Sequence, residues 1–311
     1  MPDYIVRIRP RAAFGTPLHS GTLFGHLCWA WRHRQGEASL AEWLASLAED
    51  PFLISDGMPR GRLPRPEMPP PRREGRPSLE EAERFKRAWK RRWMRRETFL
   101  KLRSGLSPQK LLEALLEEEV AEERDQQERA RWFRSRRVPH NTINRLTGRT
   151  PERGGLFFMD DLWPEEECEA EVWVRCSLGA KELEELFGMV GELGYGRDAS
   201  TGRGRFEAKT EAAPDGVLDG KWERRMSLSH GSLTENMLEA RYRLETHYGK
   251  LGSLWAGAGD PFKYPLTLLA PGANFRPADG GPYGELLGGV HPHRESVRHN
   301  GWHLTVGYRE A

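Results

Sequence analysis

The stretch from Gly194 to Phe206 (GYGRDASTGRGRF) limits what this chain can fold into more than any other segment. It holds four glycines and three arginines, together with a serine and a threonine. Glycine has no Cβ and tolerates positive φ, so its backbone can approach a ligand closely. Successive amide N–H groups in such a turn form a concave anion site, and arginine adds forked donors for phosphate. The stretch therefore predicts a pocket for a phosphate-bearing chain.

Two other interpretations of this stretch stay open. The spacing Gly194-x-Gly196-x-x-Ala199 fits a dinucleotide-binding loop, which follows a strand and opens a helix. Here the apolar spacing from Leu183 to Val190 predicts a helix before the loop, and Arg205–Lys209 predicts a strand after it. This reversed order argues against NAD, and we expect no cofactor. A plain surface turn is the second alternative, since glycine is common in turns.

Composition narrows the class of protein. The chain has 311 residues, and its 48 Lys and Arg against 46 Asp and Glu give a net charge of +2. Its length suits one large domain or two smaller ones. The three cysteines, Cys28, Cys168 and Cys176, show no paired metal-ligand spacing, so we expect reduced thiols. Because the chain opens into a strand and no apolar run reaches membrane-spanning length, we expect a cytoplasmic protein without membrane contact.

The first part of the chain predicts alternating strands and helices. Tyr4–Arg9 alternates in hydropathy, as a strand does, and Pro10 ends it. Ser20 is a suitable N-cap for a helix over Gly21–Arg34, and Gly36 closes that helix before a second amphipathic one. A short strand is predicted over Pro51–Ser55.

A long insertion is predicted at about residues 60–148. Its first part, Pro59–Arg103, carries sixteen Lys and Arg against six Glu, and many prolines interrupt regular structure at its start. Six of these arginines lie between Arg60 and Arg76. We expect the insertion to project from the first module as a thumb, rather than to fill that module's core.

Two helices are predicted inside this insertion. Ser78–Glu81 is a capping box that opens the first, along which Phe85, Trp89 and Trp93 share one face. The second runs from Leu111 to about Arg137. Interleaved basic and aromatic residues suit RNA, but tryptophan at four-residue spacing is also typical of a protein core.

The order of predicted elements indicates an α+β fold. After the insertion come strands at 156–159 and 170–176, a helix at 181–193, the glycine loop and a further strand. A β-α-β-insertion-β-α-loop-β order is ferredoxin-like. A Pro/Gly/Asp turn near Asp215 marks a boundary. We therefore predict an N-terminal module over residues 1–210 and a smaller, β-rich module over residues 211–311.

Several motifs occur in an order that resembles a known family. The resemblance is to the Cas-five-like RAMP subunit of type III-A CRISPR effector complexes, the fourth Csm subunit. It spans nearly the whole chain, with one departure at Gly21, where the resemblance implies an acidic residue. The motifs are Phe14–Leu27 (FGTPLHSGTLFGHL), Pro51–Asp56, Leu63–Pro66, His140–Arg145, the glycine loop, Tyr248–Lys250 and Pro261–Lys263.

The resemblance implies two ferredoxin-like (RAMP/RRM-like) modules, the first bearing a helical, basic thumb. It implies an RNA-binding subunit of a ribonucleoprotein in antiviral defence, which grips the repeat-derived 5′ handle of the crRNA. It further implies contacts with the large polymerase-like subunit and with the backbone RAMP subunit, with target RNA near the thumb. Such a subunit is not an enzyme.

The glycine loop and these motifs together give the expected RNA-binding residues. Single-stranded RNA is held by charge along its backbone and by stacking of its bases on aromatic or arginine side chains. We expect Phe14, Thr16, Ser20 and Thr22 to lie across from the glycine loop. The full expected set is Phe14, Thr16, Pro17, His19, Ser20, Thr22, Asn144, Arg145, Gly194, Tyr195, Gly196, Arg197, Ser200, Thr201, Gly202, Arg203, Gly204, Arg205, Lys250 and Lys263.

Two other function classes remain as alternatives. A histidine-dependent endoribonuclease of the RAMP superfamily would process crRNA with His19, His26 or His140 as general acid or base. A scaffold that binds only protein is the other. A C-terminal histidine group also raises the question of zinc, but its spacing fits no common closed site, so we expect a polar loop and no metal. This group is His291, His293, His299 and His303.

Overall fold

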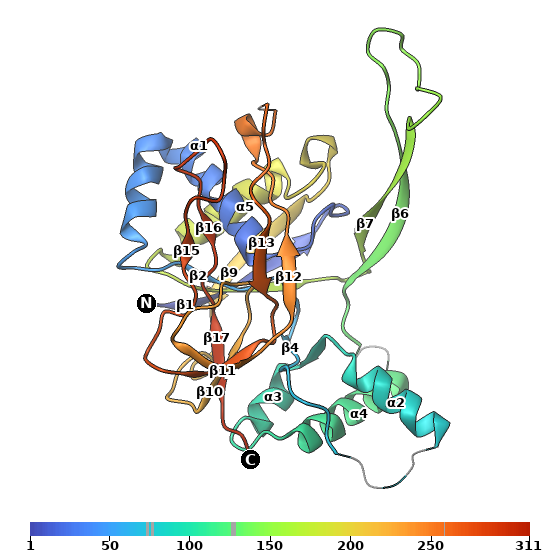
Figure 1. Ribbon diagram of the computed structural model, residues 1–311, viewed down its shortest axis with the longest axis vertical. Coiled ribbons are helices and arrows are strands. Elements are labelled where there is room, and N and C mark those ends of the chain that lie inside the picture. The colour runs from blue at the N-terminus through green and yellow to red at the C-terminus, as the bar shows by residue number, and fades with distance from the viewer. Residues whose placement is uncertain (73–74, 76–77, 126–128, 258) are drawn as a thin grey trace.

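The structure is a computed structural model that describes residues 1–72, 75, 78–125, 129–257 and 259–311 (Figure 1). Helices and antiparallel sheets are mixed along the chain, consistent with the predicted α+β class. Arg73 and Arg76 of the predicted basic stretch lie outside the described residues. Within the described ranges, no helix is both long enough and apolar enough to cross a membrane.

The first sheet has the strand order β2-β8-β1-β9, and β3 also pairs with β8. Its pairs are antiparallel throughout. Helices α1 (Ser20–Ser46) and α5 (Ala180–Leu193) contribute Leu23, Phe24 and Phe187 to the core on one side of it. The strands are β1 (Asp3–Pro10), β2 (Leu53–Ile54), β3 (Met58–Pro59), β8 (Ala170–Arg175) and β9 (Phe206–Ala212).

Both faces of this sheet are buried. Side chains alternate between the two faces of a strand. On β8, Val172 and Val174 lie in the core shared with α1 and α5, as predicted, whereas Trp173 lies in a second core on the opposite face. All three are fully buried. The second core therefore requires something to cover the far side of the sheet.

Helix α1 starts one residue earlier than the sequence predicts. His19 is its N-cap, and Ser20 is its first helical residue. Ser20 is not a cap because its hydroxyl donates to the His230 carbonyl at 3.1 Å and its backbone N–H donates to Asp56 at 3.0 Å. The break at Gly36 is confirmed, since this residue has a φ of +89° inside the helix.

The insertion contains more elements than the two predicted helices. Helix α2 ends at Trp89, so Trp93 does not continue its face but pairs with Pro64 on a short ribbon. Helix α4 ends at Arg124, and the predicted helical residue Arg137 lies on a strand instead. The elements are β4 (Arg62–Pro64), α2 (Leu79–Trp89), β5 (Trp93–Arg95), α3 (Arg96–Leu102), α4 (Pro108–Arg124) and β6 (Phe133–Asn141). The strand predicted after the insertion at 156–159 is β7 (Leu156–Pro164), which pairs with β6 and not with the first sheet.

The helical part of the insertion does not project, contrary to prediction. Met94, Phe99 and Leu111 are fully buried and pack in the second core with Ile5 and Trp173 of the first sheet. These helices therefore cover the far side of that sheet. The β6–β7 hairpin extends away from the body (Figure 1).

Ion pairs with α4 neutralise part of the positive charge of the insertion. Glu118 is buried and accepts from Arg62 at 3.3 Å, while Glu122 pairs with Arg91 at 2.7 Å. Glu119 pairs with Arg87 at 3.1 Å. The interleaved basic and aromatic residues of α2 thus serve packing against α4, which was the structural alternative for this segment.

Residues 211–311 form a second sheet with the order β11-β14-β10-β17 and two small ribbons, β12–β13 and β15–β16. The described part of this range contains no α-helix, and Met226 and Val306 instead share the second core with α3 and α4. The strands are β10 (Arg224–Ser227), β11 (Met237–Arg241), β12 (Leu244–His247), β13 (Leu266–Leu269), β14 (Asn274–Pro277), β15 (Leu286–Leu287), β16 (His299–Asn300) and β17 (Thr305–Tyr308).

Replacing Phe99 tests whether the inserted helices belong to the core. Phe99→Ala empties a fully buried position and is expected to lower the free energy of unfolding by about 3–5 kcal/mol. Phe158→Ala is the matched control, because Phe158 lies on the hairpin with 51% of its surface exposed. Urea unfolding followed by circular dichroism measures both. Equal stability of the two variants would contradict the assigned core.

Candidate nucleic-acid interface

The glycine loop begins where α5 ends at Leu193. All four of its glycines have positive φ: +91° at Gly194, +75° at Gly196, +92° at Gly202 and +69° at Gly204. A residue with a Cβ is strained in this region. The conformation predicted from glycine content is therefore confirmed, and a short 3₁₀ turn at Ala199–Thr201 forms the tip of the loop.

The loop packs directly on the N-terminal segment that precedes α1. The N–H of Gly204 donates to the carbonyl of Ala13 at 2.8 Å, and the N–H of Arg197 donates to the Thr16 hydroxyl at 3.0 Å. Within the loop, the N–H of Tyr195 donates to the Gly204 carbonyl at 3.0 Å. The expectation that Thr16 lies against the glycine loop is thus confirmed.

Tyr195 joins the loop to the start of α1. Its ring is fully buried, and its hydroxyl donates to the Pro17 carbonyl at 2.6 Å while accepting from the His19 N–H at 3.1 Å. Burial raises the pKa of this phenol, so it stays protonated and donates. Thr22 lies half-buried beside the same hydroxyl. Tyr195 was predicted to contact RNA, but its side chain is buried inside the protein.

The backbone amides of the loop are not the predicted open anion site. Besides the amides of Tyr195, Arg197 and Gly204, the N–H of Gly196 is taken by His26 Nε2 at 2.9 Å. The glycines are needed for approach to the protein itself. A Cβ on Gly204 would lie 2.1 Å from the Tyr195 carbonyl oxygen, and one on Gly196 would lie 2.6 Å from the Thr16 Cβ. Ser200 and Thr201 remain exposed at the tip.

The three arginines of the loop have different surroundings. Arg197 and Arg203 both pair with Asp161 of β7, at 2.9 and 2.7 Å. Asp161 is fully buried, whereas one quarter of each guanidinium side chain is exposed. Arg205 is half-buried, and its side chain makes no hydrogen bond or ion pair with the described residues. The predicted cluster of three free phosphate donors is therefore wrong for Arg197.

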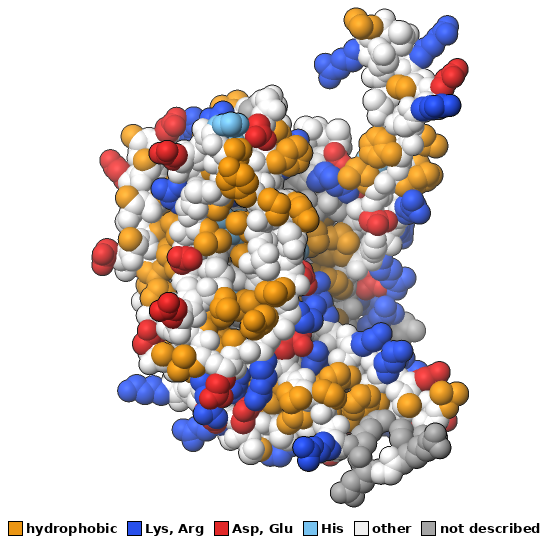
Figure 2. Space-filling view, viewed as in Figure 1, with side chains coloured by type: hydrophobic (Ala, Val, Ile, Leu, Met, Phe, Trp, Pro, Cys, Tyr) orange, Lys and Arg blue, Asp and Glu red, His pale blue; other side chains and the backbone are white. Residues whose placement is uncertain are grey.

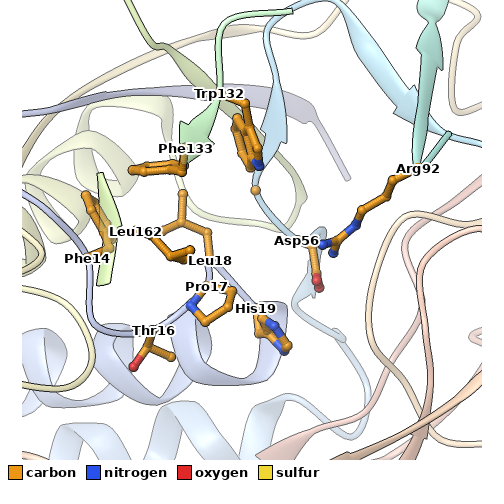
Figure 3. Close-up of a pocket in the computed structure, with 11 residues that line it drawn as sticks. Phe14, Thr16, Pro17, Leu18, His19, Asp56, Arg92, Trp132, Phe133 and Leu162 are labelled. Carbon is orange, nitrogen blue, oxygen red and sulfur yellow. The ribbon is translucent and has the colours of Figure 1, made fainter. Parts of the chain in front are cut away.

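A pocket of about 100 Å³ lies between the N-terminal segment, the base of the hairpin and the inserted ribbon (Figure 3). Its apolar side is formed by aromatic rings of the hairpin, and its polar side by His19, Asp56 and Arg92. Such a combination suits a planar, partly polar group. The lining residues are Phe14, Thr16, Pro17, Leu18, His19, Asp56, Gly57, Arg92, Trp132, Phe133 and Leu162.

The predicted N-terminal contacts divide into accessible and buried residues. Pro17 is exposed, and Thr16 and His19 are half-buried. Phe14 is 1% exposed and packs edge-on against Phe133 at a centroid distance of 5.1 Å. Ser20 is also 1% exposed. Phe14 and Ser20 are therefore buried beneath the site. The prediction that they contact RNA directly is wrong.

The remaining predicted residues lie in two other places. Asn144 and Arg145 are exposed at the tip of the hairpin, where the Asn144 side chain accepts from the Leu146 N–H at 2.9 Å. Lys250 is exposed, and its ammonium lies 5.7 Å from the Phe262 ring. Lys263 points inward and donates to the Arg298 carbonyl at 2.9 Å. Burial lowers the pKa of Lys263 to about 8.

A histidine cluster, which the sequence did not predict, lies beside the pocket. The rings of His19 and His230 stack at 4.3 Å with 6° between their planes. His247 lies 6.1 Å from His19 and 5.1 Å from His299. His299 fills the space that a Cβ on Gly21 would need, 2.4 Å away, which accounts for the glycine at that position. Partners some 200 residues apart leave no spacing signal in a single sequence.

His230 is the charged member of this cluster. Its Nδ1 lies 2.6 Å from Asp56 and its Nε2 lies 3.1 Å from Glu245, so both ring nitrogens face carboxylates. Burial disfavours the charged ring, but the charges and hydrogen bonds of these carboxylates outweigh it and raise the pKa of His230 to about 9. Burial lowers the pKa of His247 to about 4, so that ring is neutral.

The nitrogen and oxygen atoms of His19, Asp56 and His230 lie within 4.8 Å of one another, close enough to raise the question of a metal. Imidazole coordinates through lone pairs in the plane of the ring, and two parallel stacked rings do not direct those lone pairs to one ion. The proton between His230 and Asp56 already satisfies both groups. We therefore assign an ion pair here.

The C-terminal histidines do not form one group, and two of them are not in a polar loop. His291 donates from Nε2 to the Asp260 carbonyl at 3.1 Å, and His293 is exposed beside the same residue. His299 and His303 are buried elsewhere, the latter between the Ser227 hydroxyl and the Ser232 carbonyl.

No known protein-family profile and no curated protein matches the chain by sequence. Solved structures do match in fold over the full length. One is a chain of a Csm1–Csm4 cassette in complex with cA4, with 17% identity, a TM-score of 0.59, and coverage of 100% of this chain and 99% of that one. Another is a chain of a Csm3–Csm4 subcomplex of the type III-A CRISPR-Cas interference complex, with 14% identity, a TM-score of 0.61 and 99% coverage of both chains.

These matches define the class of fold. The component that both assemblies name is Csm4, and the coverage leaves almost no part of either chain unmatched. The chain therefore has the fold of Csm4, as the sequence motifs predicted. At these identities the comparison establishes the fold, and the RNA contacts must be argued from this chain's own residues.

Two glycines of the loop give a matched test of its packing. Both Gly202 and Gly204 have positive φ, so alanine at either position is expected to cost about 1–2 kcal/mol in strain. A Cβ at 202 meets open space, whereas one at 204 meets the Tyr195 backbone. Gly204→Ala is therefore expected to destabilise clearly more than Gly202→Ala in urea unfolding. Equal losses would contradict the close packing of the loop.

The charge on His230 predicts a pH dependence of stability. The pKa of His230 rises on folding, from about 6.5 for an unfolded histidine to about 9. Its contribution is therefore fully present below about pH 6.5 and is lost as pH rises through about 9. The difference in unfolding free energy between the wild type and His230→Asn should shrink across this window. A difference that stays constant from pH 6 to pH 10 would contradict the assigned imidazolium.

Proposed function

We propose that this chain is the crRNA-binding, Csm4-like subunit of a type III-A CRISPR antiviral effector complex and that it holds the 5′ handle. The observation that carries the proposal is the full-length fold match to chains of two assemblies that have Csm4 in common. Its two modules, residues 1–210 and 211–311, form one scaffold around the RNA. In the cell, the protein works in the cytoplasm as part of a ribonucleoprotein.

The order of the first sheet supports this assignment. Strands β2-β8-β1-β9, with α1 after β1 and α5 after β8, give the alternation of a ferredoxin-like unit. The insertion enters between the second and third strands of that unit. The β-rich sheet of residues 211–311 is the second ferredoxin-like module, with inserted helices α3 and α4 covering it in place of helices of its own.

The RNA passes over the tip of the glycine loop and the adjoining N-terminal segment, towards the pocket. Arg203, Arg205 and the hydroxyl of Ser200 offer donors to phosphate along one side. The Thr201 hydroxyl instead donates to the Asp198 carbonyl at 2.9 Å. Pro17, with the aromatic rings of the pocket, offers the apolar surface on which an unstacked base rests. Charge along the backbone and stacking of bases are the two terms that hold single strands.

The partners follow from the assemblies in which the matching chains occur. Those structures contain Csm1 in one case and Csm3 in the other. We propose equivalent contacts here, with a large polymerase-like subunit and with a backbone RAMP subunit. The hairpin reaches target RNA, since Figure 2 shows hydrophobic side chains along it and Lys and Arg around its tip, among them the exposed Phe158, Leu146 and Arg145.

The subunit binds RNA and does not cut it. The nuclease alternative drew on His19, His26 and His140, and no hydrogen bond or ring contact among the described residues joins His140 to His19 or His26. His26 accepts from the Gly196 N–H, and burial lowers its pKa to about 4, so it is a poor general acid near neutral pH.

Reconstitution with the two partner subunits and sequencing of the bound RNA tests this function. We expect RNAs that share one 5′ handle, bound only when this subunit is present. Recovery of a complex without RNA would support the protein-only scaffold. Recovery of RNAs with unrelated 5′ ends would contradict the assignment of handle binding.

Histidine variants separate binding from cleavage. His19→Ala and His26→Ala are expected to leave the length of the crRNA unchanged, because neither ring takes part in a cleavage step. The measurement is the length distribution of the RNA in complexes assembled with each variant. Longer, unprocessed RNA in either variant, with assembly intact, would instead favour the endoribonuclease.

A further inference from the structure

The β6–β7 hairpin is fastened to the body at its base, where one residue has an unusual position. Asp161 lies on β7 and has none of its surface exposed, although it is a carboxylate. On a strand, residues two apart share a face. Met159, Asp161 and Trp163 therefore form one face of the hairpin, and this face contacts the glycine loop through Arg197 and Arg203.

The side-chain N–H groups of Arg197 all contact groups of the protein itself. Its Nε donates to the Gly15 carbonyl at 3.2 Å. One terminal nitrogen contacts Asp198 at 2.7 Å and the Met159 sulfur at 3.1 Å, and the other contacts Asp161 and the Asp160 carbonyl, both at 2.9 Å. A guanidinium has five N–H donors, so none is left for phosphate.

Arg203 differs from Arg197 in this respect. Its Nε donates to the second carboxylate oxygen of Asp161 at 2.7 Å, and its guanidinium lies 5.8 Å from the Trp163 ring. Its two terminal nitrogens make no hydrogen bond with the described residues. The Asp161 carboxylate therefore fixes the Nε end of this guanidinium and leaves its two terminal nitrogens available to other ligands.

We propose that Asp161 and Arg197 are positioning residues that lock the hairpin to the glycine loop and orient Arg203 for an RNA phosphate. Arg197, Arg203 and Asp161 are called the loop–hairpin latch below. The part of the proposal that concerns RNA rests on the function proposed above. The part that concerns the hairpin does not.

The latch accounts for a buried carboxylate in a protein that binds a polyanion. A buried charge is costly unless it is paired and hydrogen-bonded, and Asp161 meets both conditions only through the two loop arginines. The hairpin is also joined to the body by the backbone bridge between Phe14 and Leu162, one residue from Asp161, so the latch and this bridge together set the angle of the hairpin. RNA bound to the loop and RNA bound along the hairpin are then held at a fixed position relative to each other.

A pair of adjacent aspartates provides the test for the hairpin. Asp161→Asn removes the buried charge, while Asp160→Asn removes an exposed one from the same strand. Nitroxide labels on Asn141→Cys of β6 and Glu192→Cys of α5 report the distance between hairpin and body. We expect a broader or shifted distance distribution for Asp161→Asn and an unchanged one for Asp160→Asn. An unchanged distribution for Asp161→Asn overturns the latch.

RNA binding tests whether Asp161 orients Arg203. A repelling charge and a positioning residue predict opposite changes in RNA affinity when Asp161 is replaced. If Asp161 acts only as a negative charge near RNA, its removal tightens the binding of a poly-uridine RNA. If it positions Arg203, its removal weakens binding by at least threefold, whereas Asp160→Asn binds as tightly as the wild type or more tightly. Tighter binding by Asp161→Asn overturns the positioning role. If the wild type binds no RNA, the proposed function fails, and the distance measurement still decides on the latch.

A second variant covers the case in which Asp161→Asn does not fold. Arg197→Lys keeps the positive charge but loses the planar fork that joins five acceptors. We expect it to broaden the hairpin–body distance while leaving the salt dependence of RNA binding as in the wild type. Arg203→Ala should instead lower the slope of log K against log salt by about 0.7, the value for one contact to a single strand. Equal behaviour of the two variants overturns the division of roles.

Discussion

The contact between the glycine loop and the segment before α1 is the interaction on which the rest of the site depends. The Tyr195 hydroxyl bonds to both Pro17 and His19, and the Gly204 amide bonds to Ala13. These bonds set where α1 begins, and so where the pocket opens. They require positive φ and no Cβ at Gly204, because the Tyr195 backbone occupies that space. The glycines therefore serve the protein's own packing.

The first sheet adds a second constraint, since both of its faces must be covered. Helices α1 and α5 bury one face, and the inserted helices bury the other together with the second sheet. This explains why an insertion rich in arginine packs inward: the glutamates of α4 neutralise it at Arg62, Arg87 and Arg91. The hairpin is the part of the insertion left free to extend, and Asp161 connects it back to the loop.

Much of the fold could be predicted from the sequence, and the predictions that were wrong have physical causes. Alternation located the strands of the first sheet, and glycine content predicted the positive φ values of the loop. The ends of α2 and α4 were placed too late, because amphipathic spacing continued into Trp93 and Arg137 after the chain had turned to strand pairing. The partner of Arg197 and Arg203 could not be predicted, since Asp161 lies on a hairpin whose angle depends on tertiary contacts. The stacking of His19 on His230 likewise joins residues that only the fold brings together.

Site-specific crosslinking is the most direct test of the central claim, that RNA lies across the glycine loop and the adjoining N-terminal segment. A crRNA with 4-thiouridine at successive positions of its 5′ handle would be assembled into the complex, irradiated, and the crosslinked peptides identified. The account predicts crosslinks to the peptides that contain residues 14–19 and 194–205, from neighbouring handle positions. Handle crosslinks confined to the α2–α4 helices or to the second sheet, with none on either segment, would contradict it.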